Sequence, residues 1–107
     1  MLKSAVAGQI FFSIAIVAAP QAWSADADKG YQVAKERCAS CHNIEKGGAF
    51  KQRPSSFQAI ATYRTMDDIW ARIVAPSPHA GMPEVIWVIS PDDVQDIVAY
   101  ITSLDVK

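Results

Sequence analysis

The sequence predicts a small all-α domain of three to four helices joined by irregular loops. Apolar residues recur at helical spacing in three segments, at residues 28–38, 66–74 and 91–104. The last two segments follow residues that favour a helix start, and no segment shows a convincing β-strand alternation. The run from Val85 to Ile89 is apolar throughout, and it is compatible with an extended or a helical segment.

The first predicted helix covers residues 28–38 and is followed by a loop. Asp28 is of a type that caps a helix start. Residues 43–57 contain two glycines and Pro54 among basic and polar residues, with little periodicity, so we expect an irregular loop there. The residues of the first segment that recur at helical spacing are Val33, Ala34, Arg37 and Cys38.

Two further helices are predicted in the second half of the chain. Thr65 precedes the segment 66–74, whose first turn carries two aspartates where the helix dipole favours acids, and two prolines close the run. Ser90, followed by Pro91 and two more aspartates, marks the start of the last helix. One face of that helix is apolar, so we expect it to pack on the core. The residues of this face are Val94, Ile97, Val98, Ile101 and Leu104.

Residues 1–24 are interpreted as a secretory signal peptide. Lys3 precedes an apolar run from Ala5 to Ala19, and small residues at positions 22 and 24 suit a peptidase that cuts before Ala25. An uncleaved membrane anchor is the alternative, but it needs about 20 apolar residues, whereas this run spans fifteen. We therefore expect a mature protein of residues 25–107 with no stable membrane anchor.

The mature chain of 83 residues forms one small domain, with no room for a second. A domain of this size buries little surface, and such domains usually recruit a disulfide, a metal or a cofactor. Nine basic side chains against eleven acidic ones give a net charge of about −2 without a basic patch. The composition therefore argues against nucleic-acid binding.

The motif Cys-Ala-Ser-Cys-His at residues 38–42 carries the chemistry. Residues three apart lie on one face of a helical turn, so the thiols of Cys38 and Cys41 can reach the two vinyl groups of a porphyrin. The adjacent His42 can then turn its ring toward the iron. This spacing is typical of c-type haem attachment. The expected secretion agrees with this assignment, because c-type haem is attached after export.

Three other interpretations of the two cysteines fit the sequence less well. A disulfide between Cys38 and Cys41 closes so short a loop that it would stabilise little. A thioredoxin-like redox pair needs parallel strands, which the sequence does not predict. A zinc site would have only His42 and His79 to add to the two thiols, and adjacent Cys41 and His42 are awkward ligands for one tetrahedral ion.

The mature chain resembles the cytochrome c family over essentially its whole length. An Asp-x-Gly opening, the haem motif eight residues after Gly30, a glycine-rich stretch with a proline, a Met-Pro pair and a terminal amphipathic helix follow in family order. The resemblance implies the compact cytochrome c fold around one covalently attached haem c. It also implies that Met82, in a Gly-Met-Pro sequence, is the sixth iron ligand opposite His42, with His79 as the rival ligand.

The resemblance also assigns supporting residues. Pro54 follows His42 by twelve residues, the position of a proline whose carbonyl accepts a hydrogen bond from the proximal histidine, although the usual preceding glycine is absent. Gly30 and Tyr100 resemble the contact between the first and last helices, where a missing side chain permits close approach. The rings of Tyr100 and Trp87 are expected in the core or against the haem, where either could bind a propionate.

Together these features predict an electron carrier and not an enzyme, because two axial ligands leave iron no open position for substrate. We expect a periplasmic protein that takes electrons from a dehydrogenase and gives them to an oxidase or another cytochrome. A cytochrome c subunit held permanently in a periplasmic dehydrogenase or oxidase complex is the alternative. A third hypothesis is a haem sensor or peroxidase, which requires that Met82 does not bind iron.

The loop after the haem motif carries a local cluster of basic residues, Lys46, Lys51 and Arg53. In the fold that the resemblance implies, this loop lies near the exposed haem edge. It could dock weakly on an acidic patch of a partner, and the alternative is that these are ordinary solvated charges.

Overall fold

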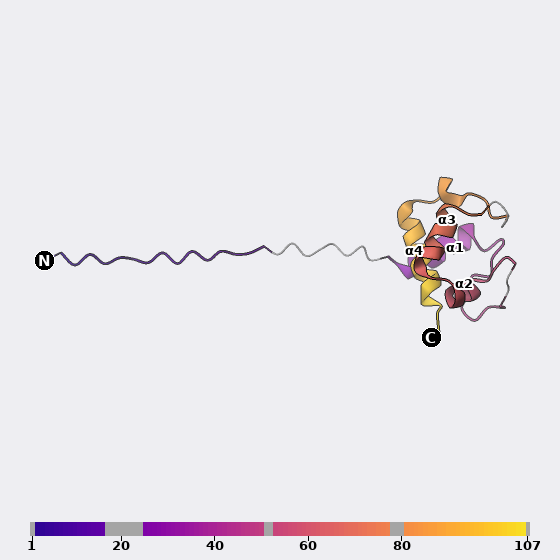
Figure 1. The fold of residues 1–107 in the computed structure, drawn as a ribbon, viewed down its shortest axis with the longest axis horizontal. Coiled ribbons are helices and arrows are strands. Elements are labelled where there is room, and N and C mark those ends of the chain that lie inside the picture. The colour runs from indigo at the N-terminus through magenta and orange to yellow at the C-terminus, as the bar shows by residue number, and fades with distance from the viewer. Residues whose placement is uncertain (1, 17–24, 51–52, 78–80, 107) are drawn as a thin grey trace.

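The computed structural model describes residues 2–16, 25–50, 53–77 and 81–106, and the domain it shows is helical (Figure 1). The all-α prediction is therefore confirmed. Residues 2–16 are exposed, have no regular secondary structure and lie apart from the helices. None of the described helices is long and apolar enough to span a membrane. The elements are α1 (Ala27–Arg37), α2 (Phe57–Tyr63), α3 (Met66–Val74), the short 3-10 helix η2 (Val85–Trp87) and α4 (Pro91–Ser103).

Helix α1 starts slightly earlier than the sequence predicts. Its N-cap is Asp26, whose carboxylate accepts hydrogen bonds from the backbone N–H groups of Asp28 and Lys29. Asp28 is therefore not the cap; it lies in the first turn, where an acidic side chain interacts favourably with the helix dipole.

Helix α2 follows directly on the predicted loop and was not predicted. Ser56 is its N-cap, and the hydroxyl accepts a hydrogen bond from the N–H of Ala59. The helix has seven residues, too few to be stable without tertiary packing. Burial of its apolar side supplies that packing, because Phe57, Ala59 and Ala61 are all buried.

Helices α3 and α4 begin at the predicted positions because local side-chain caps define their starts. At the start of α3, the hydroxyl of Thr65 accepts a hydrogen bond from the backbone N–H of Asp68. At the start of α4, Ser90 and Asp93 form a reciprocal capping box. The hydrogen bond that Asp93 accepts from the Ser90 backbone lowers the pKa of this carboxyl group. Between the two helices, Val85 to Trp87 form η2, so part of the ambiguous apolar run is helical.

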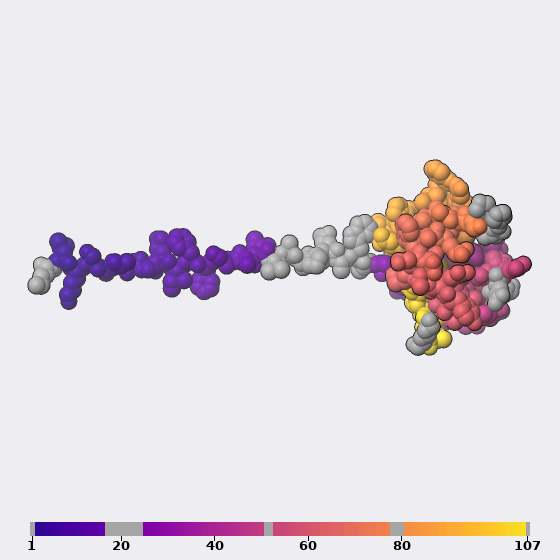
Figure 2. Space-filling model, viewed as in Figure 1, coloured from indigo at the N-terminus to yellow at the C-terminus, as the bar shows by residue number. Residues whose placement is uncertain are grey.

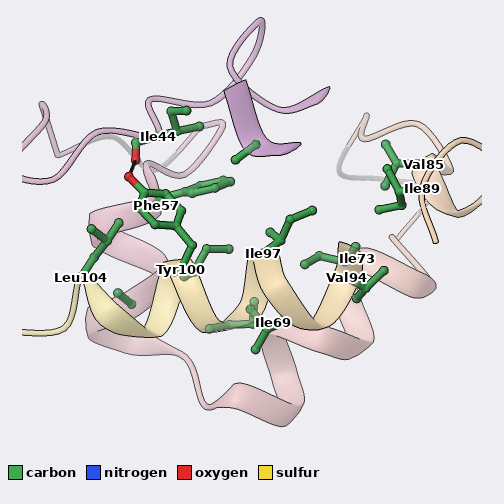
Figure 3. Packing of buried hydrophobic residues seen from close by; sticks show 14 residues of the cluster. Ile44, Phe57, Ile69, Ile73, Val85, Ile89, Val94, Ile97, Tyr100 and Leu104 are labelled. Atoms are coloured by element: carbon green, nitrogen blue, oxygen red, sulfur yellow. Dashed lines mark hydrogen bonds between the residues drawn. The ribbon is translucent and has the colours of Figure 1, made fainter. Parts of the chain in front are cut away.

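The apolar face predicted for α4 lies in the core, which gathers around this helix (Figure 3). Ile97 and Ile101 are fully buried, and burial of each contributes about 1.5–3 kcal/mol to stability. Ile69 and Ile73 of α3 join the same cluster. The remaining predicted residues of this face, all buried, are Val94, Val98 and Leu104.

Helices α1 and α4 approach so closely that only glycine fits at their contact. A Cβ atom built on Gly30 would lie 1.9 Å from the carbonyl oxygen of Asp96, which is backbone and cannot move aside independently. The side chain of Asp96 adds a second link, since its Oδ1 accepts the N–H of Asp26 at 2.8 Å. Beside this contact the rings of Tyr31 and Tyr100 pack with centroids 5.2 Å apart. The close approach of the first and last helices at Gly30 is therefore observed, and Tyr100 joins the same helix pair through its contact with Tyr31.

Substitution of Gly30 by alanine should lower the free energy of unfolding of the haem-loaded protein by at least about 2 kcal/mol, because the new methyl group forces the helices apart. Guanidinium titration followed by circular dichroism measures this change. Gln32→Ala, at an exposed position of the same helix, is the control and should leave the midpoint nearly unchanged. Equal midpoints for the two variants would contradict the close contact.

Candidate functional site

The sequence motif at residues 38–42 continues α1 by one irregular turn. The N–H of Cys38 donates to the carbonyl of Ala34, and the N–H groups of Cys41 and His42 both donate to the carbonyl of Cys38, at 3.2 and 2.9 Å. This turn holds the two cysteines and the histidine together, as the sequence predicts. Both thiols are free, so no disulfide joins them.

The two thiols have different surroundings. Cys38 is half-buried and packs against the hydrophobic core, whereas Cys41 is exposed. Burial raises the pKa of the Cys38 thiol above its usual value, because the charged thiolate would lose hydration. Cys38 therefore behaves in the folded protein as a small neutral side chain, anchored on the side of the motif that faces the core.

The ring of His42 is oriented by a backbone carbonyl. Its Nδ1 lies 2.6 Å from the carbonyl oxygen of Ser55, and since a carbonyl carries no hydrogen, Nδ1 is the donor. The ring also packs against Phe57, with centroids 5.6 Å apart. Because Nδ1 is engaged by the carbonyl, Nε2 is the ring nitrogen that would be available to a metal ion.

The carbonyl that contacts His42 differs from the one predicted. The family resemblance implies that the carbonyl of Pro54 accepts this hydrogen bond. In the structure the carbonyl of the next residue, Ser55, lies at hydrogen-bond distance from Nδ1 of His42. The backbone N–H of Phe57 donates to the carbonyl of Asn43 at 2.9 Å, so residues 55–57 run alongside residues 42–43. This pairing of two segments decides which carbonyl faces the His42 ring. The spacing of residues along the sequence does not identify that carbonyl to within one residue.

The loop after His42 is held by side chains that sequence analysis did not identify. The amide of Gln58 links two segments: its Oε1 accepts the N–H of Gly47 at 3.2 Å, and its Nε2 donates to the carbonyl of Leu104 at 2.6 Å. The hydroxyl of Tyr31 on α1 donates to Glu45 at 2.9 Å. This hydrogen bond to the carboxylate is the main reason why the pKa of Tyr31 is raised.

Tyr100 ties the same loop to the core. Its hydroxyl donates to the carbonyl of Ile44 at 2.6 Å, across 56 positions of sequence, and the ring itself is buried (Figure 3). Burial is the main cause of the raised pKa of Tyr100. The prediction that this ring packs in the core is correct, and its hydroxyl is already engaged by the loop.

The segment of the predicted sixth ligand begins with a turn. Gly81 has φ of +68°, a conformation that favours glycine, and it precedes Met82. Met82 is half-buried and packs against the core cluster. Its predicted rival, His79, lies outside the described residues.

Two further expectations concern the surface. Trp87 is 83 % exposed and its indole N–H donates to Glu84, so it does not pack in the core. The other half of that prediction, packing against the haem, stays a prediction. Of the predicted basic cluster, Lys46 and Arg53 are exposed, and Lys51 is outside the described part of the chain.

The donor set at this site fits a haem joined through two thioether bonds. Two free thiols lie three residues apart on one turn, and the adjacent imidazole has its far nitrogen directed by the bond at Nδ1. Imidazole nitrogen and the thioether sulfur of Met82 are both established axial ligands of haem iron. In the described segments, this site included, no three His, Cys, Asp or Glu side chains are placed to share a metal ion.

Residues 25–101 match a protein family described as cytochrome c oxidase, cbb3-type, subunit III. The matched range begins two residues before α1 and ends within α4, so it includes the helix contact and the whole of residues 38–42. No curated protein and no solved structure matches the chain.

Replacement of Tyr100 by phenylalanine should lower the free energy of unfolding of the haem-loaded protein by about 1–2 kcal/mol, because the carbonyl of Ile44 loses its donor. Thermal unfolding followed by circular dichroism measures the loss. Tyr63→Phe removes a hydroxyl from an exposed ring and serves as the control. If both variants unfold at the same temperature, the hydroxyl of Tyr100 does not hold the loop.

Proposed function

Since this chain belongs to the cytochrome c family represented by subunit III of cbb3-type cytochrome c oxidases, we propose that it is a periplasmic one-electron carrier. Family membership supports a haem-binding, electron-transfer role. The observation that carries the finer proposal is the turn at residues 38–42, where two free thiols adjoin an imidazole oriented by the Ser55 carbonyl. A haem c held there, one per chain, is the cofactor we propose.

Each residue of the site has a proposed role. Cys38 and Cys41 hold the haem covalently through their sulfur atoms, and His42 binds the iron through Nε2. The hydrogen bond from Nδ1 of His42 to the Ser55 carbonyl keeps the ring orientation and raises its strength as a ligand. In this role Ser55 replaces Pro54, which lies one residue earlier.

Met82 is the proposed second axial ligand. Its thioether is a soft donor on a segment already anchored to the core, which favours a defined position over a mobile one. The haem, when bound, supplies a reversible couple between ferrous and ferric iron, and a thioether ligand favours a higher potential than a second histidine does. The chain's own contribution is to hold both ligands and to cover the site with apolar residues.

The proposed export of this protein to the periplasm rests on the N-terminal segment, which has the pattern of a signal peptide. The proposed cleavage before Ala25 leaves Asp26 available to cap α1, so removal of residues 1–24 takes nothing from the described helices. The family match also begins at residue 25, which supports residues 25–107 as the functional domain. The proposed partners are a periplasmic dehydrogenase as donor and an oxidase or another cytochrome as acceptor.

A second candidate function is that of a subunit held permanently in a dehydrogenase or oxidase complex. The description of the matched family, an oxidase subunit, favours this alternative. Size-exclusion chromatography of the native periplasmic and membrane fractions separates the two: a carrier elutes as the free domain, and a subunit elutes with its complex.

Covalent attachment predicts that haem stays on the polypeptide after denaturing gel electrophoresis and is detected there by haem staining. Cys38→Ala or Cys41→Ala should leave at most one thioether bond and reduce the yield of holoprotein, because each thiol reaches one vinyl group. Ala39→Ser, at an exposed position of the same turn, is the matched control and should mature normally. Complete extraction of haem from the wild type by acid acetone would refute covalent attachment.

The axial assignment predicts that Met82→Ala abolishes the long-wavelength charge-transfer band that the family resemblance associates with methionine bound to ferric haem. The same variant should bind added imidazole or cyanide far more readily, since it opens one iron position. Absorption spectroscopy and ligand titration measure both effects. His79→Ala should retain the band, and the reverse result would transfer the sixth position to His79.

A further inference from the structure

A short apolar segment projects from the domain between the proposed sixth ligand and α4. Ile86, Trp87 and Val88 are 41 %, 83 % and 56 % exposed, whereas Val85 and Ile89 on either side are buried. The buried pair anchors the segment, and the three residues between them face outward. Figure 2 shows the region around η2 standing out from the top of the helical domain.

The indole of Trp87 is held in place before any partner arrives. Its Nε1 donates to Oε2 of Glu84 at 3.0 Å, so the one polar group of the ring is satisfied within the chain. An exposed tryptophan with a fixed ring and a satisfied N–H loses little conformational freedom when it is covered. Tryptophan is also the residue type most often found at binding hot spots.

The exposed acidic residues next to this segment in the sequence indicate the chemistry of its partner. No lysine or arginine occurs between residues 73 and 106, a stretch that contains five acidic residues. Asp93 forms the capping box of α4, and Asp96 accepts a hydrogen bond from the backbone N–H of Asp26 beside α1. The hydrogen bond from Ser90 is the main cause of the lowered pKa of Asp93, and Lys29 and Arg37 of α1, which lie near that carboxyl group, lower it further. Glu84 and Asp92, which precede and follow the apolar residues, are exposed. A complementary surface therefore has an apolar pocket with lysine or arginine at its rim.

We propose that residues 86–88, the apolar docking segment, insert into such a cation-rimmed pocket on the protein that accepts electrons from this one. The proposal rests on the proposed function. Trp87 lies five residues after Met82, at most about 18 Å along an extended chain, so docking there keeps the partner close to the site. Residues 46–50 of the loop after His42 lie on a different part of the domain from η2 (Figure 1), so they do not supply this contact.

The acidic residues next to the segment favour a protein over a membrane as its binding partner. An exposed tryptophan beside other apolar residues also suits a lipid interface. Glu84 and Asp92 would then approach an anionic lipid surface and be repelled. A protein pocket with a cationic rim satisfies both the apolar residues and the acids.

The test uses the reduced holoprotein and washed membranes of the source bacterium in air, with the rate of oxidation measured against protein concentration. Trp87→Ala should raise the half-saturating concentration at least tenfold, because the ring fills the pocket. Tyr63→Ala, which removes another exposed aromatic ring, is the matched control and should have no such effect. The double variant Glu84→Gln, Asp92→Asn should raise the half-saturating concentration and flatten its dependence on salt.

Three further measurements on Trp87→Ala identify the cause of any effect. The absorption spectrum, the reduction potential and the rate with a small inorganic oxidant should match the wild type; a change in any of them places Trp87 against the haem and overturns the docking proposal. Loss of self-association seen for the wild type in sedimentation would assign the segment to a second copy. Loss of binding to protein-free vesicles of anionic lipid would assign it to a membrane.

The outcomes also separate this proposal from the function on which it rests. If the membranes oxidise wild type and Trp87→Ala with equal half-saturating concentrations, the docking segment is refuted and the carrier function stands. If the wild type is reduced and reoxidised by small reagents but not by the membranes at any concentration, both the proposed acceptor and the docking proposal fail.

Discussion

The contact of Gly30 with the backbone of Asp96 is the constraint on which the rest of this structure depends. Backbone atoms meet there without an intervening side chain, so no side chain fits between α1 and α4 at this point. The motif at residues 38–42 begins where α1 ends, and its position is therefore fixed relative to α4. Asp96 and Asp26 strengthen the same contact through a hydrogen bond between the helices.

From that helix pair, hydrogen bonds extend outward to the loop that carries the imidazole. Tyr31 on α1, Gln58 on α2 and Tyr100 on α4 each hold one part of residues 44–47. Three of the four described α-helices therefore contribute one side chain each to holding this loop. A domain that buries as little surface as this one gains order at the site from polar contacts as well as from its apolar core.

The charged residues are unevenly divided along the chain. Basic residues occur in α1 and in the loop after His42, whereas the region from α3 to α4 ends in a stretch with acids alone. Some of these acids have structural partners, such as Asp96 with α1 and Asp93 with the α4 cap. Two others, Glu84 and Asp92, are exposed and flank the apolar docking segment, where Glu84 accepts the indole N–H of Trp87.

The sequence by itself determined the features that depend on neighbouring residues. Thr65 and Ser90 cap the helices that follow them, and the spacing of Cys38 and Cys41 depends on a single turn, so all of these were predictable. Tertiary structure decided the rest. The seven residues of α2 need packing to be helical, and Ser55, not Pro54, faces His42 because two distant segments pair. The partners of Gln58 and the exposure of Trp87 likewise depend on elements far apart in sequence, whose relative placement is set by packing and not by local pattern.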